Sequence, residues 1–205
     1  MKTLVFDFGG VLFNWHPPTL LRRLVPHLAH DEASAAHWVR EIFEGYDGDW
    51  QRFDRGLLDV PEIVDSIAQR TGLERADVQR VVDGVPGELQ PIAPSVALLR
   101  RLHADGRRLL FLSNMPALYA DHLEREYDFV GCFADGVFSA RVQEVKPHPA
   151  IFHLAAERFG HAPGEMVFLD DHLPNVETAR ALGWNALQFS DAARAEADLR
   201  ARGWL

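Results

Sequence analysis

Short apolar runs that end in acidic, hydroxyl or amide residues constrain the fold of this 205-residue chain more than any other feature. Each run is long enough for a buried strand and too short for a helix. The residues that follow each run are typical of a tight loop at the end of a strand. Three such runs are residues 3–6 before Asp7, residues 109–112 before Ser113 and Asn114, and residues 166–169 before Asp170 and Asp171.

Segments with helical periodicity separate these runs after Pro94, so that strand and helix alternate along the chain. Strands that alternate with helices of this length form βαβ units. The sequence therefore predicts an α/β fold with a doubly wound, Rossmann-like parallel sheet. Two further runs, residues 137–138 and 186–189, complete the predicted strands. The predicted helices are residues 95–103, 116–127, 149–159, 174–182 and 191–202.

Residues 17–85 have a different pattern, because their apolar residues recur every third or fourth position. Pro17 and Pro18 stand at the start of this segment, and Pro86 and Gly87 follow it. The pattern predicts about four helical elements inserted after the first strand. We therefore expect a helical cap of residues 17–90 and a core of residues 1–16 and 91–205.

Charge and cysteine content narrow the classes of partner and compartment. The formal net charge is −9 and the sequence has no Lys/Arg tract, which argues against a nucleic-acid surface. No apolar run approaches the roughly 20 residues that cross a bilayer, so we expect no membrane partner. Cys132 is the single cysteine, which indicates a reducing, cytoplasmic location without an internal disulfide.

The polar residues at the strand ends form a candidate ligand site. Ligands bind at the carboxyl ends of the strands in a parallel sheet. Taken singly, such residues are common as turn residues or helix caps, and Lys146 alone reads equally well as a solvated loop cation. Their expected position at one sheet edge favours a site made of Asp7, Ser113, Asn114, Lys146, Asp170 and Asp171.

Lys146 is notable because the chain carries nearly all of its positive charge on arginine. Of the 21 basic residues, 19 are arginine, and the other lysine is Lys2. Lysine is a compact point charge with rotatable donors, whereas arginine is a planar fork. This difference makes Lys146 a stronger candidate for a specific role than an ordinary surface lysine.

Four motifs, in this order, resemble those of the haloacid dehalogenase-like (HAD) hydrolase superfamily, most of whose members are phosphatases. The resemblance covers the whole predicted core, and the helical insertion is similar to the family's cap after the first strand. The motifs are residues 6–12 around Asp7, Leu112-Ser113-Asn114, Val145-Lys146-Pro147, and residues 168–183 with Asp170, Asp171 and Asn175.

The resemblance implies a Mg²⁺-dependent phosphatase that hydrolyses a small phosphomonoester. Asp7 would attack phosphorus and form an aspartyl-phosphate that water then hydrolyses. Mg²⁺ prefers oxygen ligands. Its expected ligands are Asp7, the carbonyl of Gly9, Asp171, and Asp170 directly or through water.

The same resemblance assigns the substrate contacts. Ser113, Asn114 and neighbouring backbone amides would bind phosphate oxygens. Lys146 would neutralise charge on Asp7 and on the phosphoryl group, which makes it both a catalytic and a substrate-binding residue. The expected partner is a small anionic substrate, and the chain is expected to be a monomer or a homodimer.

Gly9 departs from the family pattern. Phosphatases of this family usually carry a second aspartate at this position, as the general acid and base. The glycine form is similar to a subgroup that includes glucose-1-phosphate phosphatase-type members, which suggests a sugar phosphate as the substrate. Metal-bound water or a nearby group would then carry out the missing proton transfer, and His16 and Asn14 are candidates for that group.

Two other functions are compatible with these residues. A 2-haloacid dehalogenase would use Asp7 to attack carbon without a metal, although Asp170 and Asp171 favour a metal site. A non-catalytic HAD-fold binding protein would retain the same scaffold.

In the cap, loops are expected over residues 47–50 and 53–56. Trp50 and Arg55 there are either substrate contacts or, as we favour, a core residue and a solvated cation.

Overall fold

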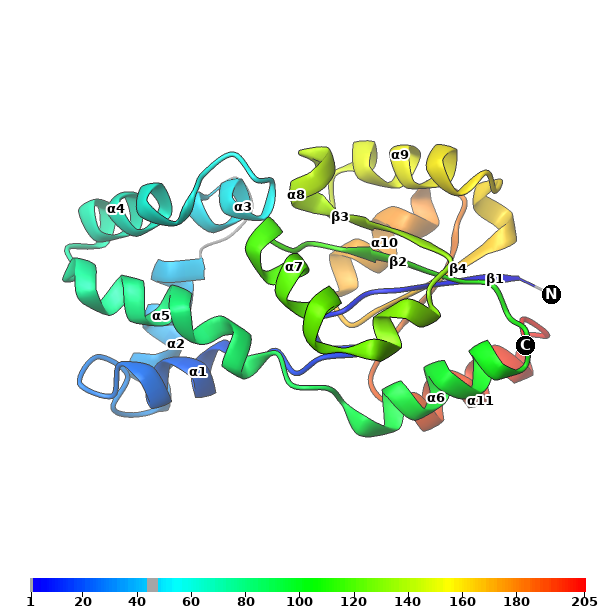
Figure 1. Cartoon of the computed structure of the whole chain (residues 1–205), viewed down its shortest axis with the longest axis horizontal. Helices are drawn as coiled ribbons and strands as arrows, with labels where there is room; N and C mark the ends of the chain where they lie inside the picture. Colours follow the sequence, from blue (N-terminus) through cyan, green and yellow to red (C-terminus); the bar gives the residue numbers. More distant parts are fainter. Residues whose placement is uncertain (1, 44–47) are drawn as a thin grey trace.

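A five-stranded parallel sheet forms the centre of the computed structural model, which describes residues 2–43 and 48–205 (Figure 1). The strand order is β3-β2-β1-β4-β5. Every neighbouring pair is parallel, as the alternation of strand and helix predicts. The strands are β1 (Thr3–Phe6), β2 (Leu109–Ser113), β3 (Asp135–Phe138), β4 (Met166–Asp170) and β5 (Asn185–Gln188).

Helices cover both faces of this sheet, which confirms the predicted α/β class. Leu4 and Phe6 point to one apolar cluster and Val5 to the other, because successive strand residues face opposite sides. The first cluster includes residues of α6, α7 and α11, and the second includes residues of α9 and α10. The helices of this part are α6 (Ala93–Ala104), α7 (Ala117–Glu126), α8 (Ser139–Val142), α9 (Pro149–Phe159), α10 (Leu173–Ala181) and α11 (Ala192–Ala201), with 3-10 turns η1 (Asp128–Cys132) and η2 (Pro163–Glu165).

Helices between β1 and α6 lie together at one end of the molecule (Figure 1). We call α1–α5 the cap helices. The division into a core of residues 1–16 and 91–205 and a cap of residues 17–90 stays a prediction. The cap helices are α1 (Pro17–Leu24), α2 (Glu32–Phe43), α3 (Asp49–Asp54), α4 (Val60–Thr71) and α5 (Arg75–Glu88).

The loops expected over residues 47–50 and 53–56 are wrong for the residues that helix α3 contains. Residues 49–54 are helical, and Trp50 and Phe53 are buried on one side of the helix. Asp49 accepts hydrogen bonds from Ser66 Oγ at 2.7 Å and from Arg70 Nε at 3.0 Å, both on α4. These tertiary contacts hold a short helix whose own sequence is polar. Asp47 lies outside the described residues.

Helix α5 also differs from the sequence expectation, because it passes through Pro86 and ends at Glu88. A proline inside a helix lacks the N–H that would bond the carbonyl four residues earlier, here that of Val82. The Tyr119 hydroxyl of α7 donates to this carbonyl at 2.8 Å. A side chain from outside the cap helices therefore satisfies the group that Pro86 leaves open.

None of the helices in the described part of the chain is long and apolar enough to span a membrane.

Tyr119→Phe should lower the free energy of unfolding by about 1–3 kcal/mol, because it leaves the Val82 carbonyl without its donor. Tyr127→Phe is the matched control, since that hydroxyl donates to Leu89 at a longer 3.3 Å in a part-buried position. Urea unfolding measures both losses. In a Pro86→Ala background the cost of Tyr119→Phe should shrink, because the backbone N–H returns. A loss no larger than that of Tyr127→Phe would contradict this account.

Candidate active site

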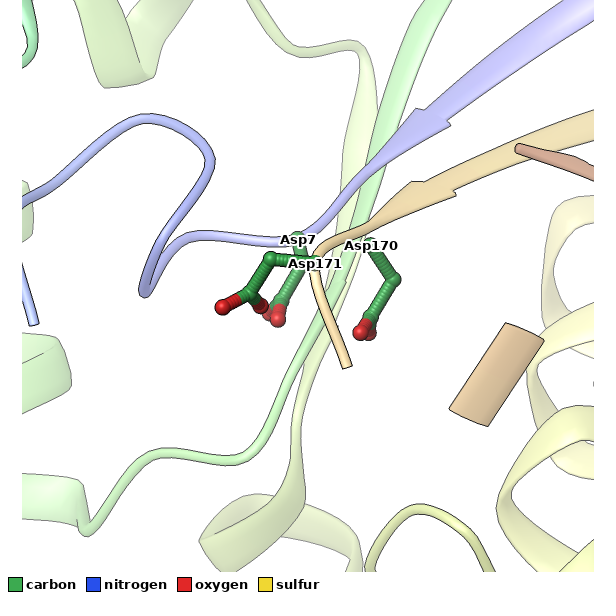
Figure 2. Close-up of side chains that lie close together, drawn as sticks. All are labelled: Asp7, Asp170 and Asp171. Atoms are coloured by element: carbon green, nitrogen blue, oxygen red, sulfur yellow. The ribbon is translucent and has the colours of Figure 1, made fainter. Parts of the chain in front are cut away.

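Three carboxylates meet where β1 and β4 end, as Figure 2 shows for Asp7, Asp170 and Asp171. One oxygen of each lies within 4.8 Å of the others. The sheet causes this convergence, because Phe6 pairs with Leu169 and the next residue of each strand reaches the same edge. The Asp7 N–H donates to the Leu169 carbonyl at 2.9 Å, which extends the pairing into the site.

The ammonium of Lys146 lies between two of these carboxylates. Its Nζ is 2.8 Å from Asp7 Oδ1 and 2.7 Å from Asp170 Oδ2, and the side chain is 1% exposed. Burial opposes the charged form, but Asp170 and Asp7 outweigh burial and raise the pKa of Lys146. The lysine therefore carries a fixed positive charge next to Asp7.

Asn114 holds the backbone of Lys146 from both sides. Its Nδ2 donates to the Lys146 carbonyl at 2.9 Å, and the Lys146 N–H donates to its Oδ1 at 2.8 Å. The side chain predicted to bind substrate thus has a positioning contact as well, although it also lines the cavity described below. Its role toward substrate stays a prediction.

Asp170 is fully buried and surrounded by donors. Besides Lys146, it accepts hydrogen bonds from the Asn175 side chain at 3.0 Å and from the His172 N–H at 2.8 Å. These contacts fix Asp170 and through it the ammonium of Lys146. Within this cluster, Asp7 and Asp171 line the cavity and are therefore open to a ligand.

Ser113, the last residue of β2, is buried, and its Oγ has no hydrogen-bond partner among the residues that the structure describes. A buried hydroxyl without a partner is costly, so such a group at a strand end is suited to a ligand oxygen. Ser113 itself is not among the residues that line the cavity. Its predicted phosphate contact stays a prediction.

A cavity of about 480 Å³ opens above this cluster. Its polar base contains Asp7, Gly9, Asn114, Lys146 and Asp171. Most of the remaining wall is apolar and comes from both the cap helices and the core. The apolar lining residues are Trp15, Phe43, Trp50, Val85, Leu89, Met115, Pro116 and Tyr119, and the others are Gln51, Asp54, His172 and Asn175.

The polar base of the cavity has more acidic groups than cationic groups. Burial, together with Asp170 and Asp171, raises the pKa of Asp7 to about 8 although Lys146 acts in the opposite direction. Burial and the neighbouring Asp170 also raise the pKa of Asp171. Three carboxylates thus share one ammonium. A divalent cation bound here would offset the excess negative charge.

The donor set fits magnesium. Carboxylate and carbonyl oxygens are the ligands that Mg²⁺ takes in proteins. Asp7 and Asp171 would hold it with the carbonyl of Gly9, and all three residues line the same cavity. Gly10 supports this arrangement, because at its φ of +69° the carboxylate of Asp171 occupies the space that a Cβ would need.

Several other sequence expectations have a clear outcome. His16 is exposed, and neither His16 nor Asn14 lines the cavity, so nothing in the described site supports them as proton-transfer residues. Trp50 is buried, which agrees with its interpretation as a core residue, and it also lines the cavity, so its contact with substrate stays a prediction. Arg55 is not a fully solvated cation, since its side chain is 24% exposed and lies 3.8 Å from Glu144. Asp54 lines the cavity but is not among the residues predicted from the sequence, because a lone aspartate in a polar segment gives no signal of function.

The chain belongs to the haloacid dehalogenase-like hydrolase family, whose model matches residues 1–183. It is 26% identical to the sesquiterpene phosphatase astK of Aspergillus oryzae, over 97% of this chain and 95% of that protein. It is 30% identical to a phosphoglycolate phosphatase of Shigella boydii, over 65% of this chain and 56% of that protein. The protein is therefore a hydrolase of a family that includes phosphatases.

A solved structure with the same fold is a HAD family enzyme from Bacteroides thetaiotaomicron, in complex with magnesium and inorganic phosphate. It matches with a TM-score of 0.71 and 24% identity, over 91% of this chain and 93% of that chain. This likeness confirms the HAD-type fold.

Gly10→Ala should weaken Mg²⁺ binding at least about tenfold, because the new methyl group displaces the Asp171 carboxylate. Gly9→Ala is the matched control. Its Cβ would lie 3.6 Å from Trp15 Cβ, an ordinary contact, and the Gly9 carbonyl is retained. Isothermal titration with MgCl₂ measures both affinities. Equal affinities for the two variants would contradict the assigned role of Asp171.

Proposed function

We propose that this protein is a Mg²⁺-dependent phosphatase that hydrolyses a small phosphomonoester through an aspartyl-phosphate on Asp7. The observation that carries the proposal is the buried Lys146 ammonium, 2.8 Å from Asp7 and 2.7 Å from Asp170, with Asp171 open to the same cavity. Two anions, carboxylate and phosphate, must meet here. A cation fixed beside the nucleophile stabilises that approach.

In the first step an Asp7 oxygen forms a bond to phosphorus, the ester P–O bond breaks, and the leaving alcohol takes up a proton. In the second step water attacks the same phosphorus and the Asp7 carboxylate leaves. Lys146 holds Asp7 in place and offsets charge on the phosphoryl oxygens. Magnesium, when bound, supplies further neutralisation of the phosphate charge.

The dehalogenase alternative uses the same Asp7 but attacks carbon. The presence of a third carboxylate in the site, that of Asp171, argues against a dehalogenase. Asp171 is not needed to orient Lys146, which Asp7 and Asp170 already contact. A cluster with excess carboxylate suits a metal-assisted reaction on phosphate better than displacement of halide.

The substrate's organic part is apolar in this proposal. Among the described residues, eight apolar side chains line the cavity beyond its polar base, including Trp50, Phe43 and Trp15. A sugar would need a polar partner for each of its hydroxyls, because burying unpaired hydroxyl groups is costly, and apolar side chains outnumber the four polar ones in the described wall beyond the base. The relative named as a sesquiterpene phosphatase also supports an apolar alcohol. The sugar phosphate expected from the sequence stays a prediction, as do the cytoplasmic location and the monomeric or dimeric state.

The kcat/KM for octyl phosphate or a prenyl phosphate should exceed that for glucose 1-phosphate by at least about tenfold, because apolar contacts discriminate by this amount. Phosphate release with and without MgCl₂ measures the difference, and EDTA should abolish the activity. Asp7→Asn should reduce kcat at least about 10³-fold. Trp50→Ala should reduce the preference for octyl phosphate.

Trp38→Ala is the control, since Trp38 does not line the cavity. A preference for glucose 1-phosphate would contradict the proposed apolar substrate class, but it would not contradict the proposed phosphatase activity. Chloride release from 2-chloropropionate that persists in EDTA, without phosphate release from any ester, would overturn the phosphatase.

A further inference from the structure

The phosphatase reaction needs a proton for the leaving alcohol, and Gly9 has no side chain to give one. Three carboxyl groups line the cavity in the described part of the chain. Asp7 is the proposed nucleophile, and Asp171 belongs to the proposed metal site. The third is Asp54, at the end of cap helix α3, where no assigned role uses it.

Contacts with the core fix the position of Asp54. Its backbone carbonyl accepts a hydrogen bond from Ser139 Oγ at 2.5 Å. Ser139 is fully buried and also accepts from the Met115 N–H at 2.8 Å. A segment of the cap is thus attached to the start of α8, next to the strand ends that carry the site.

The next two residues strengthen this attachment. Arg55 lies 3.8 Å from Glu144 across the same boundary. Gly56 has a φ of +71°, and a Cβ there would lie 2.8 Å from the Ala140 carbonyl oxygen, so the backbones approach closely. Residues 54–56 therefore contact residues 139–144 at three successive positions, and the carboxyl group of Asp54 is held at the cavity wall.

The surroundings of Asp54 keep it protonated. Burial raises its pKa to about 8, with Asp7 acting in the same direction and Lys146 in the opposite one. The third titratable group that faces it is Tyr119, whose hydroxyl proton is donated to the Val82 carbonyl. A carboxylic acid that is neutral near pH 7 can donate a proton in a cavity where an ordinary aspartate could not.

We propose that Asp54 is the catalytic general acid of this protein, held by Ser139 and supplied by the cap in place of the carboxyl group absent at Gly9. This inference rests on the proposed phosphatase function. As the ester P–O bond breaks, the Asp54 proton passes to the leaving oxygen and the alcohol departs. The Asp54 carboxylate then takes a proton from the water that attacks phosphorus, which restores the starting state.

Two aryl phosphates of similar shape test this role. Phenyl phosphate has a basic leaving group that needs a proton, whereas the 4-nitrophenolate of 4-nitrophenyl phosphate leaves without one. Asp54→Asn should reduce kcat/KM, which reports the step that breaks the ester bond and not the later hydrolysis of phospho-Asp7, about 10²-fold or more for phenyl phosphate and much less for 4-nitrophenyl phosphate. Asp83→Asn, an exposed cap aspartate that does not line the cavity, should leave both rates unchanged.

The pH profile is a second measurement. With phenyl phosphate, kcat/KM of the wild-type protein should fall above about pH 8, as Asp54 loses its proton, and this decline should be absent in Asp54→Asn. Equal losses for both substrates, or no loss for phenyl phosphate, would overturn the role of Asp54. Failure of the wild-type protein to hydrolyse either ester with Mg²⁺ would instead overturn the phosphatase itself.

Ser139→Ala tests the positioning of Asp54. The variant removes the donor to the Asp54 carbonyl and leaves the carboxyl group in place. It should reduce kcat/KM for phenyl phosphate more than for 4-nitrophenyl phosphate, by a smaller factor than Asp54→Asn. A reduction of equal size for both substrates would show that Ser139 supports the fold alone and would overturn its role as a positioning residue.

Discussion

The ammonium of Lys146 is the interaction on which the site depends. Without it, the sheet would bring the carboxylates of Asp7 and Asp170 together at one buried edge with neutral hydrogen-bond donors but without the positive charge that offsets their repulsion. Asn114 fixes the lysine backbone, and Asn175 fixes the far side of Asp170. The result is a rigid positive charge beside Asp7, and the charge still unbalanced at Asp171 defines where a divalent cation fits.

The sequence predicts the sheet and its functional edge well, because both follow from local pattern. Apolar runs of strand length specify buried parallel strands, and strands of one sheet bring the residues after them to one edge. Asp7, Asp170 and Asp171 converge for this reason. The contacts of Asn114 with Lys146 join residues 32 positions apart and have no local signal, so they appear only in the folded chain.

The cap is less predictable because tertiary contacts override local preference there. Pro86 is expected to end a helix, yet α5 continues to Glu88, and Tyr119 bonds the carbonyl that proline leaves open. Residues 49–54 look like a loop, yet Ser66 and Arg70 hold Asp49 in a helix. The consequence is functional, since this helix carries Asp54 to the cavity. The carboxyl group that is absent at Gly9 in the first motif is thus supplied by Asp54, which is distant in the sequence.

The central claim is that Asp7 is the nucleophile, and trapping the covalent intermediate tests it most directly. The protein would be mixed with Mg²⁺ and a phosphomonoester that it hydrolyses, quenched in acid on the millisecond scale, and digested for mass spectrometry. The account predicts a phosphoryl group on the peptide that contains Asp7, removed by hydroxylamine as expected for an acyl phosphate. A phosphoryl group on another residue, or full turnover with no covalent phosphoprotein at any time, would contradict it.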